Sequence, residues 1–241
     1  MSQDNGIARF DVILESSPYA IEQIDEIGDF REYARGAAIE TGLEGEVLVG
    51  GTTAVSYDTK QANDCDTLFI VPLILLAIGA ILALLLLRSL IAPMYLLGTI
   101  VLSYVSTLGL TTWFFLNVFG YDGVGSAVPL YLFVFLAALG VDYNIYLMAR
   151  IREETEQRNL HDGVQVALSR TGGVITSAGI ILAGTFGALM TLPLRDLFQL
   201  GFAVAVGVLL DTFVVRTIMV PAIVVLLGRW NWWPGRRFRQ T

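Results

Sequence analysis

Residues 132–154 read LFVFLAALGVDYNIYLMARIREE, an apolar run with a single aspartate near its middle and a charged end. A helix that crosses the hydrocarbon core of a bilayer needs about 20 mostly apolar residues. We therefore expect a membrane-spanning helix at about 128–150. An ionisable side chain this far inside a span is costly to insert and by default marks a functional site. The stretch thus predicts both a membrane fold and the place where its chemistry lies.

Four further apolar stretches flank this one. They predict spanning helices at about 68–87, 92–117, 172–192 and 198–227. The composition agrees, because 55% of the residues are hydrophobic and 15% are charged, whereas about 25% are charged in ordinary soluble domains. The sequence therefore predicts an all-α transmembrane bundle of five helices within residues 67–228.

The stretch that precedes the bundle, residues 1–66, is acidic. It holds 14 of the 22 acidic residues and four of the 15 basic ones. Residues 8–14 and 46–50 have the pattern of strands, and residues 17–42, with Pro18 in the first turn, have that of a helix. Because one β-α-β unit cannot bury a sheet by itself, we expect a small partial α/β segment whose other half lies elsewhere.

The arginines predict the orientation of the bundle. One arginine separates the first two spans, four lie between the third and fourth, and four follow the fifth, whereas the intervening loops hold one at most. Since basic loops stay in the cytoplasm, we expect a multi-pass plasma membrane protein with residues 1–66 extracytoplasmic. The basic tail, residues 229–241, would lie in the cytoplasm, and residues 150–170 would form an amphipathic helix at the membrane surface.

The first six residues, MSQDNG, have the pattern of neither a signal peptide nor a membrane anchor. An acidic segment that is exported needs one or the other. We therefore expect a transmembrane helix upstream of this sequence.

Asp142 and Tyr143 form the first candidate site, a proton relay in the third span. A carboxylate at this depth should face a bundle interior or water and be able to take up and release a proton. The alternative is that Asp142 only accepts hydrogen bonds as a structural group. The adjacent phenol of Tyr143, with Tyr146 one turn further on, favours the functional reading.

Asp211 and Arg216 are the second candidate pair, in the fifth span, and Asp211 lies about as far along its helix as Asp142 does along its own. Residues five apart lie about 140° apart around an ideal α-helix. This spacing favours a partner on another helix for each residue. An ion pair within the helix is the alternative, because long arginine side chains can bend back.

The fourth span is rich in small residues, which favour close contact between helices. Within it, Thr176 and Ser177 could add hydroxyl groups to a proton path. Hydroxyls also bond to carbonyls of their own helix, so both readings stay open.

Other kinds of chemistry find no support. Cys65 is the only cysteine and His161 the only histidine, so this chain alone offers neither a disulfide nor a zinc site. We expect no catalytic residues, no metal and no cofactor, because the sequence shows no nucleophile with a base and no phosphate-binding loop. The tryptophans and arginines after residue 228 adjoin a span directly, which favours a membrane anchor over nucleic-acid binding.

Five strings together resemble the MMPL (mycobacterial membrane protein large) family of the RND transporter superfamily, over nearly the whole chain. They are GGTTAVSYDT, LLRSLIAPMYLLGTIVLSY, FVFLAALGVDYNIYLMARIREE, TGGVITSAG and DTFVVRTIMVPA. The combination of GVDYN, RIREE and DTFVVR at their mutual distances is the specific part of the match.

The resemblance implies the carboxy-terminal part of an exporter of lipids or other hydrophobic molecules that is driven by the proton-motive force. The chain would be an RND-type half-transporter fragment, with residues 1–66 as the end of a porter segment. Asp142 and Tyr143 would form a relay with an equivalent pair in the first repeat, and Asp211 and Arg216 match charged residues of the family's last span.

This sequence holds no second Asp-Tyr pair of that kind. The resemblance therefore implies three partners: the bilayer, a hydrophobic substrate, and an amino-terminal repeat or another chain that completes the relay. The alternative function is an accessory or assembly subunit, or a split-gene remnant, that does not transport.

Overall fold

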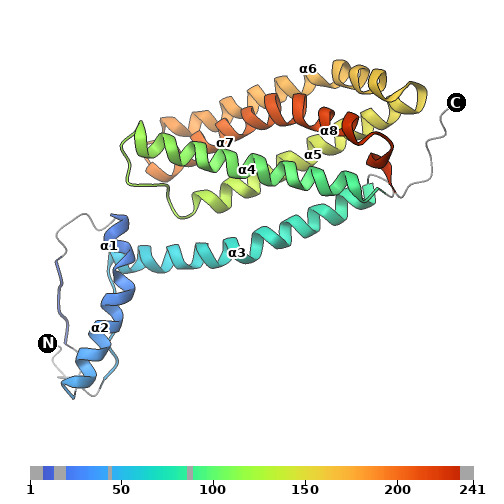
Figure 1. The fold of residues 1–241 in the computed structure, drawn as a ribbon. Coiled ribbons are helices and arrows are strands. Elements are labelled where there is room, and N and C mark those ends of the chain that lie inside the picture. Colours follow the sequence, from blue (N-terminus) through green and yellow to red (C-terminus); the bar gives the residue numbers. More distant parts are fainter. Residues whose placement is uncertain (1–7, 14–19, 43–44, 86–88, 234–241) are drawn as a thin grey trace. The chain divides into compact units, whose positions relative to one another are not determined.

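The structure is a computed structural model that describes residues 8–13, 20–42, 45–85 and 89–233. Figure 1 shows that helices dominate it, and no β-strand occurs among the described residues. The chain divides into two compact units, Met1–Ala62 and Asn63–Thr241.

The first unit contains two short helices, α1 (Ile21–Asp25) and α2 (Ile27–Glu40), and the beginning of α3 (Thr52–Leu85). Helix α2 ends just before Gly42, whose φ of 70° suits glycine because that conformation crowds a Cβ. The helix predicted for residues 17–42 is thus present as α1 and α2 in its described part.

Side chains of α2 reach the first turns of α3. Arg31 donates from Nη2 to Asp58 Oδ2 at 2.9 Å. A Cβ on Gly28 would lie 2.8 Å from the hydroxyl oxygen of Tyr57, so the two helices approach closely there. These contacts, and an ion pair between Lys60 and Asp25, hold the first unit together.

The prediction of a partial α/β segment is wrong for the described residues. Residues 8–13 and 46–50 form no strand, and Leu14 and residues 17–19 lie outside the described part. Phe10 is 86% exposed. A strand needs a neighbouring strand for its backbone hydrogen bonds, and neither segment has one in the described residues, so an alternating pattern was not sufficient.

The second unit holds the membrane bundle, and the prediction of five spans is confirmed for the described residues. Five helical segments are long and apolar enough to cross a membrane. They are α3, α4 (Ile91–Asn117), α5 (Val128–Gln157), α6 (Leu160–Gly187) with the 3₁₀ turn η1 (Ala188–Thr191), and α7 (Arg195–Leu210) continued by η2 (Asp211–Met219) and α8 (Val220–Leu227).

The surface helix predicted for residues 150–170 does not exist as a separate element. Its first part continues α5 to Gln157, and its second part opens α6 at Leu160. Asn159 caps α6 by accepting a hydrogen bond from the backbone N–H of Asp162 at 3.0 Å. A single tight turn therefore joins two helices that both extend beyond their predicted ends.

Helices α4 to α8 lie alongside one another (Figure 1). Two clusters of buried side chains fill the space between them, and α5 contributes Leu132, Phe133 and Leu136 to these clusters. Glycine permits the closest approach: a Cβ on Gly207 of α7 would lie 2.9 Å from side-chain atoms of both Leu136 and Thr107. The packing holds α7 against α4, α5 and α6.

The carboxy-terminal end of the bundle is tied to the beginning of α4. A 3₁₀ turn, η3 (Gly228–Trp232), follows α8. Ser89 donates from Oγ to the carbonyl of Asn231 at 2.7 Å, and the N–H of Leu90 donates to the carbonyl of Trp233 at 3.0 Å. The arginines of the predicted tail after Trp233 lie outside the described residues.

Candidate functional site

The fifth span changes its helical geometry where its charged residues lie. Asp211–Met219 is a π-helix between α7 and α8. Backbone hydrogen bonds of a π-helix join residues five apart, and such turns are frequent at functional sites. Residues five apart therefore lie near one face here, instead of about 140° apart as in an α-helix.

This geometry pairs Asp211 with Arg216. Arg216 donates from Nε to Asp211 Oδ2 at 2.6 Å, and its Nη2 donates to the same oxygen. Arg216 is 2% exposed and Asp211 9%. The expectation that this spacing disfavours an ion pair within the helix is wrong, because it assumed an α-helix.

Arg216 also contacts α5. Its Nη2 donates to the backbone carbonyl of Leu139 at 3.3 Å. Its guanidinium carbon lies 4.4 Å from the centroid of the Tyr143 ring, within the range of a cation–π interaction. Gly140 adjoins this contact, since a Cβ there would lie 4.0 Å from Nη2, an ordinary van der Waals distance. The site therefore joins Asp211, Arg216 and Tyr143 from two helices.

Asp142 does not join this cluster. Adjacent residues point about 100° apart around a helix, so the turn that directs Tyr143 toward Arg216 directs Asp142 away from it. Asp142 is exposed, and Tyr146, one turn later, is 47% exposed. The two predicted relay residues thus lie on different faces of α5 in this chain.

Thr176 and Ser177 lie on α6 and are half-buried and exposed, respectively. Ser177 donates from Oγ to the carbonyl of Val174 at 3.1 Å, within its own helix. Bonding to a carbonyl of the same helix is one of the two readings that the sequence left open for Ser177. Helix α6 meets the π-helix at Gly179, where an added Cβ would collide with Thr212.

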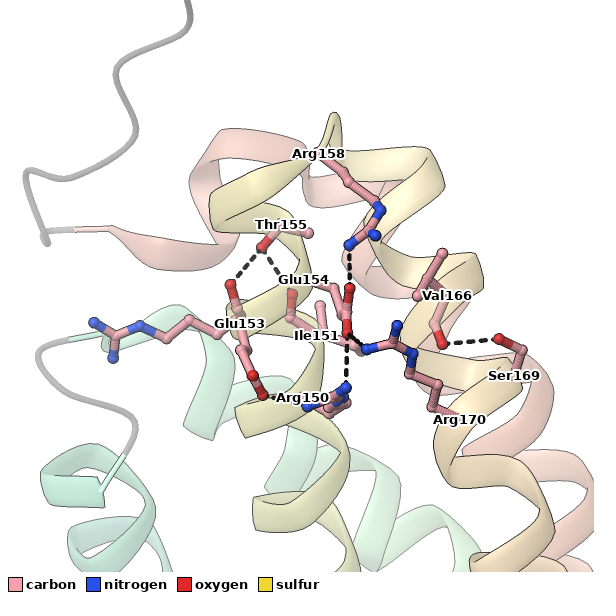
Figure 2. Close-up of polar contacts among 10 residues, drawn as sticks. Arg150, Ile151, Glu153, Glu154, Thr155, Arg158, Val166, Ser169 and Arg170 are labelled. Carbon is pink, nitrogen blue, oxygen red and sulfur yellow. Dashed lines mark hydrogen bonds and ion pairs between the residues drawn. The ribbon is translucent and has the colours of Figure 1, made fainter.

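A second charged centre, at the turn between α5 and α6, was not predicted (Figure 2). Glu154 is buried, with 4% of its side chain exposed. Its Oε1 lies 2.9 Å from Nη2 of Arg150 and 2.7 Å from Nη1 of Arg170, and its Oε2 pairs with Arg158. The arginines four residues before and after Glu154 were a readable signal, because residues four apart share a helix face.

This Glu154 centre joins α5 to α6. Arg150 also pairs with Glu153 at 2.5 Å. A cavity of about 320 Å³ adjoins the cluster, lined by Tyr146, Ala149, Arg150, Glu153, Arg170 and Thr171. Three cations around one carboxylate make this an anchor for the turn between the two helices.

The opposite end of the bundle is fixed by a buried amide. Gln199 of α7 is fully buried; its Oε1 accepts from the N–H of Gly125 at 2.7 Å and its Nε2 donates to the carbonyl of Gly123 at 3.0 Å. Arg195 stacks on the ring of Tyr121 at 4.7 Å. The loop between α4 and α5 is therefore held against α7.

Comparison with known proteins finds close relatives in several bacteria. A membrane protein of Streptomyces coelicolor is 50% identical over 237 residues, which cover 98% of this chain and 28% of that protein. The apo-petrobactin exporter of Bacillus anthracis is 43% identical over 243 residues, 99% of this chain and 32% of that protein. A Mycobacterium tuberculosis protein named "Probable transport protein MmpL12" is 37% identical over 236 residues, 98% of this chain and 20% of that protein.

The chain thus spans about a third or less of the length of these relatives. The two that carry functional names are named for transport, which agrees with a transport protein and not with an enzyme. A family model described as the MMPL family matches residues 1–241. Because that match covers the whole sequence, the chain belongs to the MMPL family.

Proposed function

We propose that this chain forms the carboxy-terminal membrane part of an exporter of lipids or other hydrophobic molecules, driven by the proton-motive force. The observation that carries the proposal is the buried ion pair of Asp211 and Arg216. Its arginine stacks on Tyr143, which directly follows Asp142 in α5. Ionisable side chains inside membrane spans often mark proton relays. The name of one relative, the apo-petrobactin exporter of Bacillus anthracis, supports export of a small molecule.

In this proposal Asp142 carries the proton. Its exposed face on α5 receives a second Asp-Tyr pair from another part of the protein or from another chain. Tyr143, held by Arg216, links Asp142 to the π-helical turn. Uptake and release of the proton at Asp142 would change the charge on the residue next to Tyr143, and π-helical turns are frequent at functional sites.

The orientation follows from the arginines. We propose a plasma membrane protein in which residues 1–66 lie outside, while the Glu154 centre and the carboxy-terminal end lie in the cytoplasm. Labelling of cysteine substitutions at Asp122 and Gln157 with an impermeant reagent should modify only the first from outside. Equal labelling of both would contradict this orientation.

The test of the function is Asp142→Asn in the complete protein that contains this segment, reconstituted in vesicles with an imposed proton gradient. Asn keeps the shape and cannot titrate. Export driven by the proton gradient should be lost, while folding and membrane insertion stay normal. Asp122→Asn, an exposed aspartate outside the spans, is the matched control and should export normally.

A labelled lipid and apo-petrobactin, the compound in the name of the Bacillus anthracis relative, are the two substrates to compare. The proposal fails if Asp142→Asn exports at the normal rate and still stops when the gradient is discharged. A non-transporting accessory subunit would leave export unchanged in both variants.

A further inference from the structure

Helix α4 carries a row of buried hydroxyl groups: Ser103, Thr107 and Thr111. They are four residues apart, so they share one face of the helix. Ser103 is 2% exposed and both threonines are fully buried. The hydroxyl oxygen of each has no hydrogen-bond partner among the residues that the structure describes.

Other threonines of the bundle behave differently. Thr99 and Thr112, also in α4, donate to carbonyls of their own helix at 2.8 Å. Thr171 in α6, as buried as the row, does the same at 2.8 Å. Bonding to the own helix is the common way for a threonine to satisfy its hydroxyl inside a helix, and the row departs from it.

The row lies between helices, away from lipid. Thr107 packs against Gly207 of α7 and near Leu136 of α5, because a Cβ on Gly207 would lie 2.9 Å from side-chain atoms of both. Ile100, one turn before Ser103, packs at Gly140, where a Cβ would lie 3.3 Å from Ile100 and 4.0 Å from Nη2 of Arg216. Ile100 and Arg216 thus both lie beside Gly140, and the row continues along α4 from Ile100.

Arg216 has the same deficiency as the row. Its Nη1 is buried and has no hydrogen-bond partner in the described part of the chain. A buried polar group without a partner destabilises the fold, and nearly all such groups in folded proteins are bonded to protein or to ordered water. Three hydroxyls of α4 and one N–H of Arg216 therefore each need a hydrogen-bond partner.

The spacing fits water. Residues four apart are separated by about 6 Å along a helix, which is too far for a direct bond between hydroxyls. Two O–H···O bonds of about 2.7–2.8 Å each bridge nearly that distance through one oxygen. One water molecule between successive hydroxyls would satisfy both of them.

We propose that Ser103, Thr107 and Thr111 bind a single file of water molecules that ends on Nη1 of Arg216. At its other end the file stops at Phe115, four residues after Thr111, which is fully buried and contacts the rings of Phe119 and Phe202 at 5.3 Å each. The positive charge of Arg216 disfavours protons in the file. The file hydrates the site and does not conduct.

The hydration stands on the geometry alone. Its purpose rests on the proposed function: water on Nη1 keeps the guanidinium solvated when charge changes beside it, so that Arg216 can remain buried throughout a transport cycle. This purpose requires that Asp142 carries a proton, whereas the water file does not.

The experiment is water-edited solid-state NMR on the full chain in lipid bilayers, which measures transfer of magnetisation from water to individual side chains. Ser103, Thr107 and Thr111 should receive it early, whereas Thr171, equally buried and bonded to its own helix, should lag. A row as slow as Thr171 is a dry helix contact and overturns the proposal.

Thr107→Val tests the continuity of the file, because valine keeps the shape and removes the hydroxyl. Transfer to the Nη protons of Arg216 should fall, because the bridging waters lose a hydrogen-bond partner. Thr112→Val, whose hydroxyl is bonded to its own helix, is the control and should leave the transfer unchanged. Unchanged transfer in Thr107→Val would overturn the file even if the row is wet.

These outcomes separate the two proposals. A hydrated row together with normal, gradient-dependent export by Asp142→Asn would leave the water file intact and reject the proton role of Asp142. A dry row together with loss of export in Asp142→Asn would do the reverse.

Discussion

Asp211 and Glu154 are both buried carboxylates of the bundle, and they are neutralised in opposite ways. Asp211 contacts one arginine five residues along its own π-helical turn, at 2.6 Å. Glu154 contacts three arginines from two helices, and Arg170 among them has 54% of its side chain exposed. Arg216, by contrast, is almost completely buried.

This difference indicates which of the two centres tolerates the loss of a charged side chain. At Asp211 the charges sum to zero, so removal of either partner leaves an isolated charge inside the bundle. At Glu154 the arginines exceed the carboxylate and can turn toward water when it is lost. The Glu154 centre suits a structural anchor, whereas the Asp211 centre is sensitive to any change of charge nearby.

The largest expected effect comes from breaking the Asp211 centre. Arg216→Leu leaves Asp211 buried without its cation and should lower the free energy of unfolding by about 3–5 kcal/mol. Denaturant unfolding in detergent micelles measures it. The double variant Asp211→Asn with Arg216→Leu should recover most of the loss, because no charge remains; a double variant as unstable as the single one would contradict the charge argument.

Glu154→Gln should have a smaller effect. It removes the charge of a carboxylate that pairs with three arginines. Arg150 still pairs with Glu153, and the side chains of Arg158 and Arg170 can reach water. We expect a loss of about 1.5–3 kcal/mol, the range for hydrogen bonds to a charged group. Exposed Glu156→Gln is the control. A loss larger than that of Arg216→Leu would reverse the ranking of the two centres.

The smallest effect should follow from removing one of the surplus arginines. Arg170→Gln should cost less than about 1 kcal/mol, because its side chain is largely exposed and water screens its charge. Arg152→Gln, whose Nε lies 3.6 Å from Glu156 at the surface, is the matched control and should cost still less. If Arg170→Gln proves as damaging as Glu154→Gln, the three arginines are not in surplus and the comparison fails.

Parts of the site were readable from the sequence and parts were not. The sequence singled out Asp211, Arg216 and Tyr143, which the structure brings together. It could not show that the helix changes to π geometry at Asp211, since the spacing rule for an α-helix gave the opposite answer. The row at Ser103 was visible as hydroxyls four apart, but only the packing of α4 shows that they are buried.

The sequence by itself determined the five spans, because insertion of a helix depends on the summed hydrophobicity of about 20 local residues. It also determined the family, through strings around Asp142 and Asp211. Strand formation in the first unit, by contrast, required a neighbouring strand that an alternating pattern cannot supply.

Tertiary structure alone decided which charges meet. Asp142 and Tyr143 are neighbours in sequence, yet they lie on different faces of α5, and only Tyr143 contacts Arg216. Glu154 became the centre of three arginines when α6 folded back and brought Arg170 to α5. Such contacts depend on the relative positions of helices, which the residues of one segment do not specify.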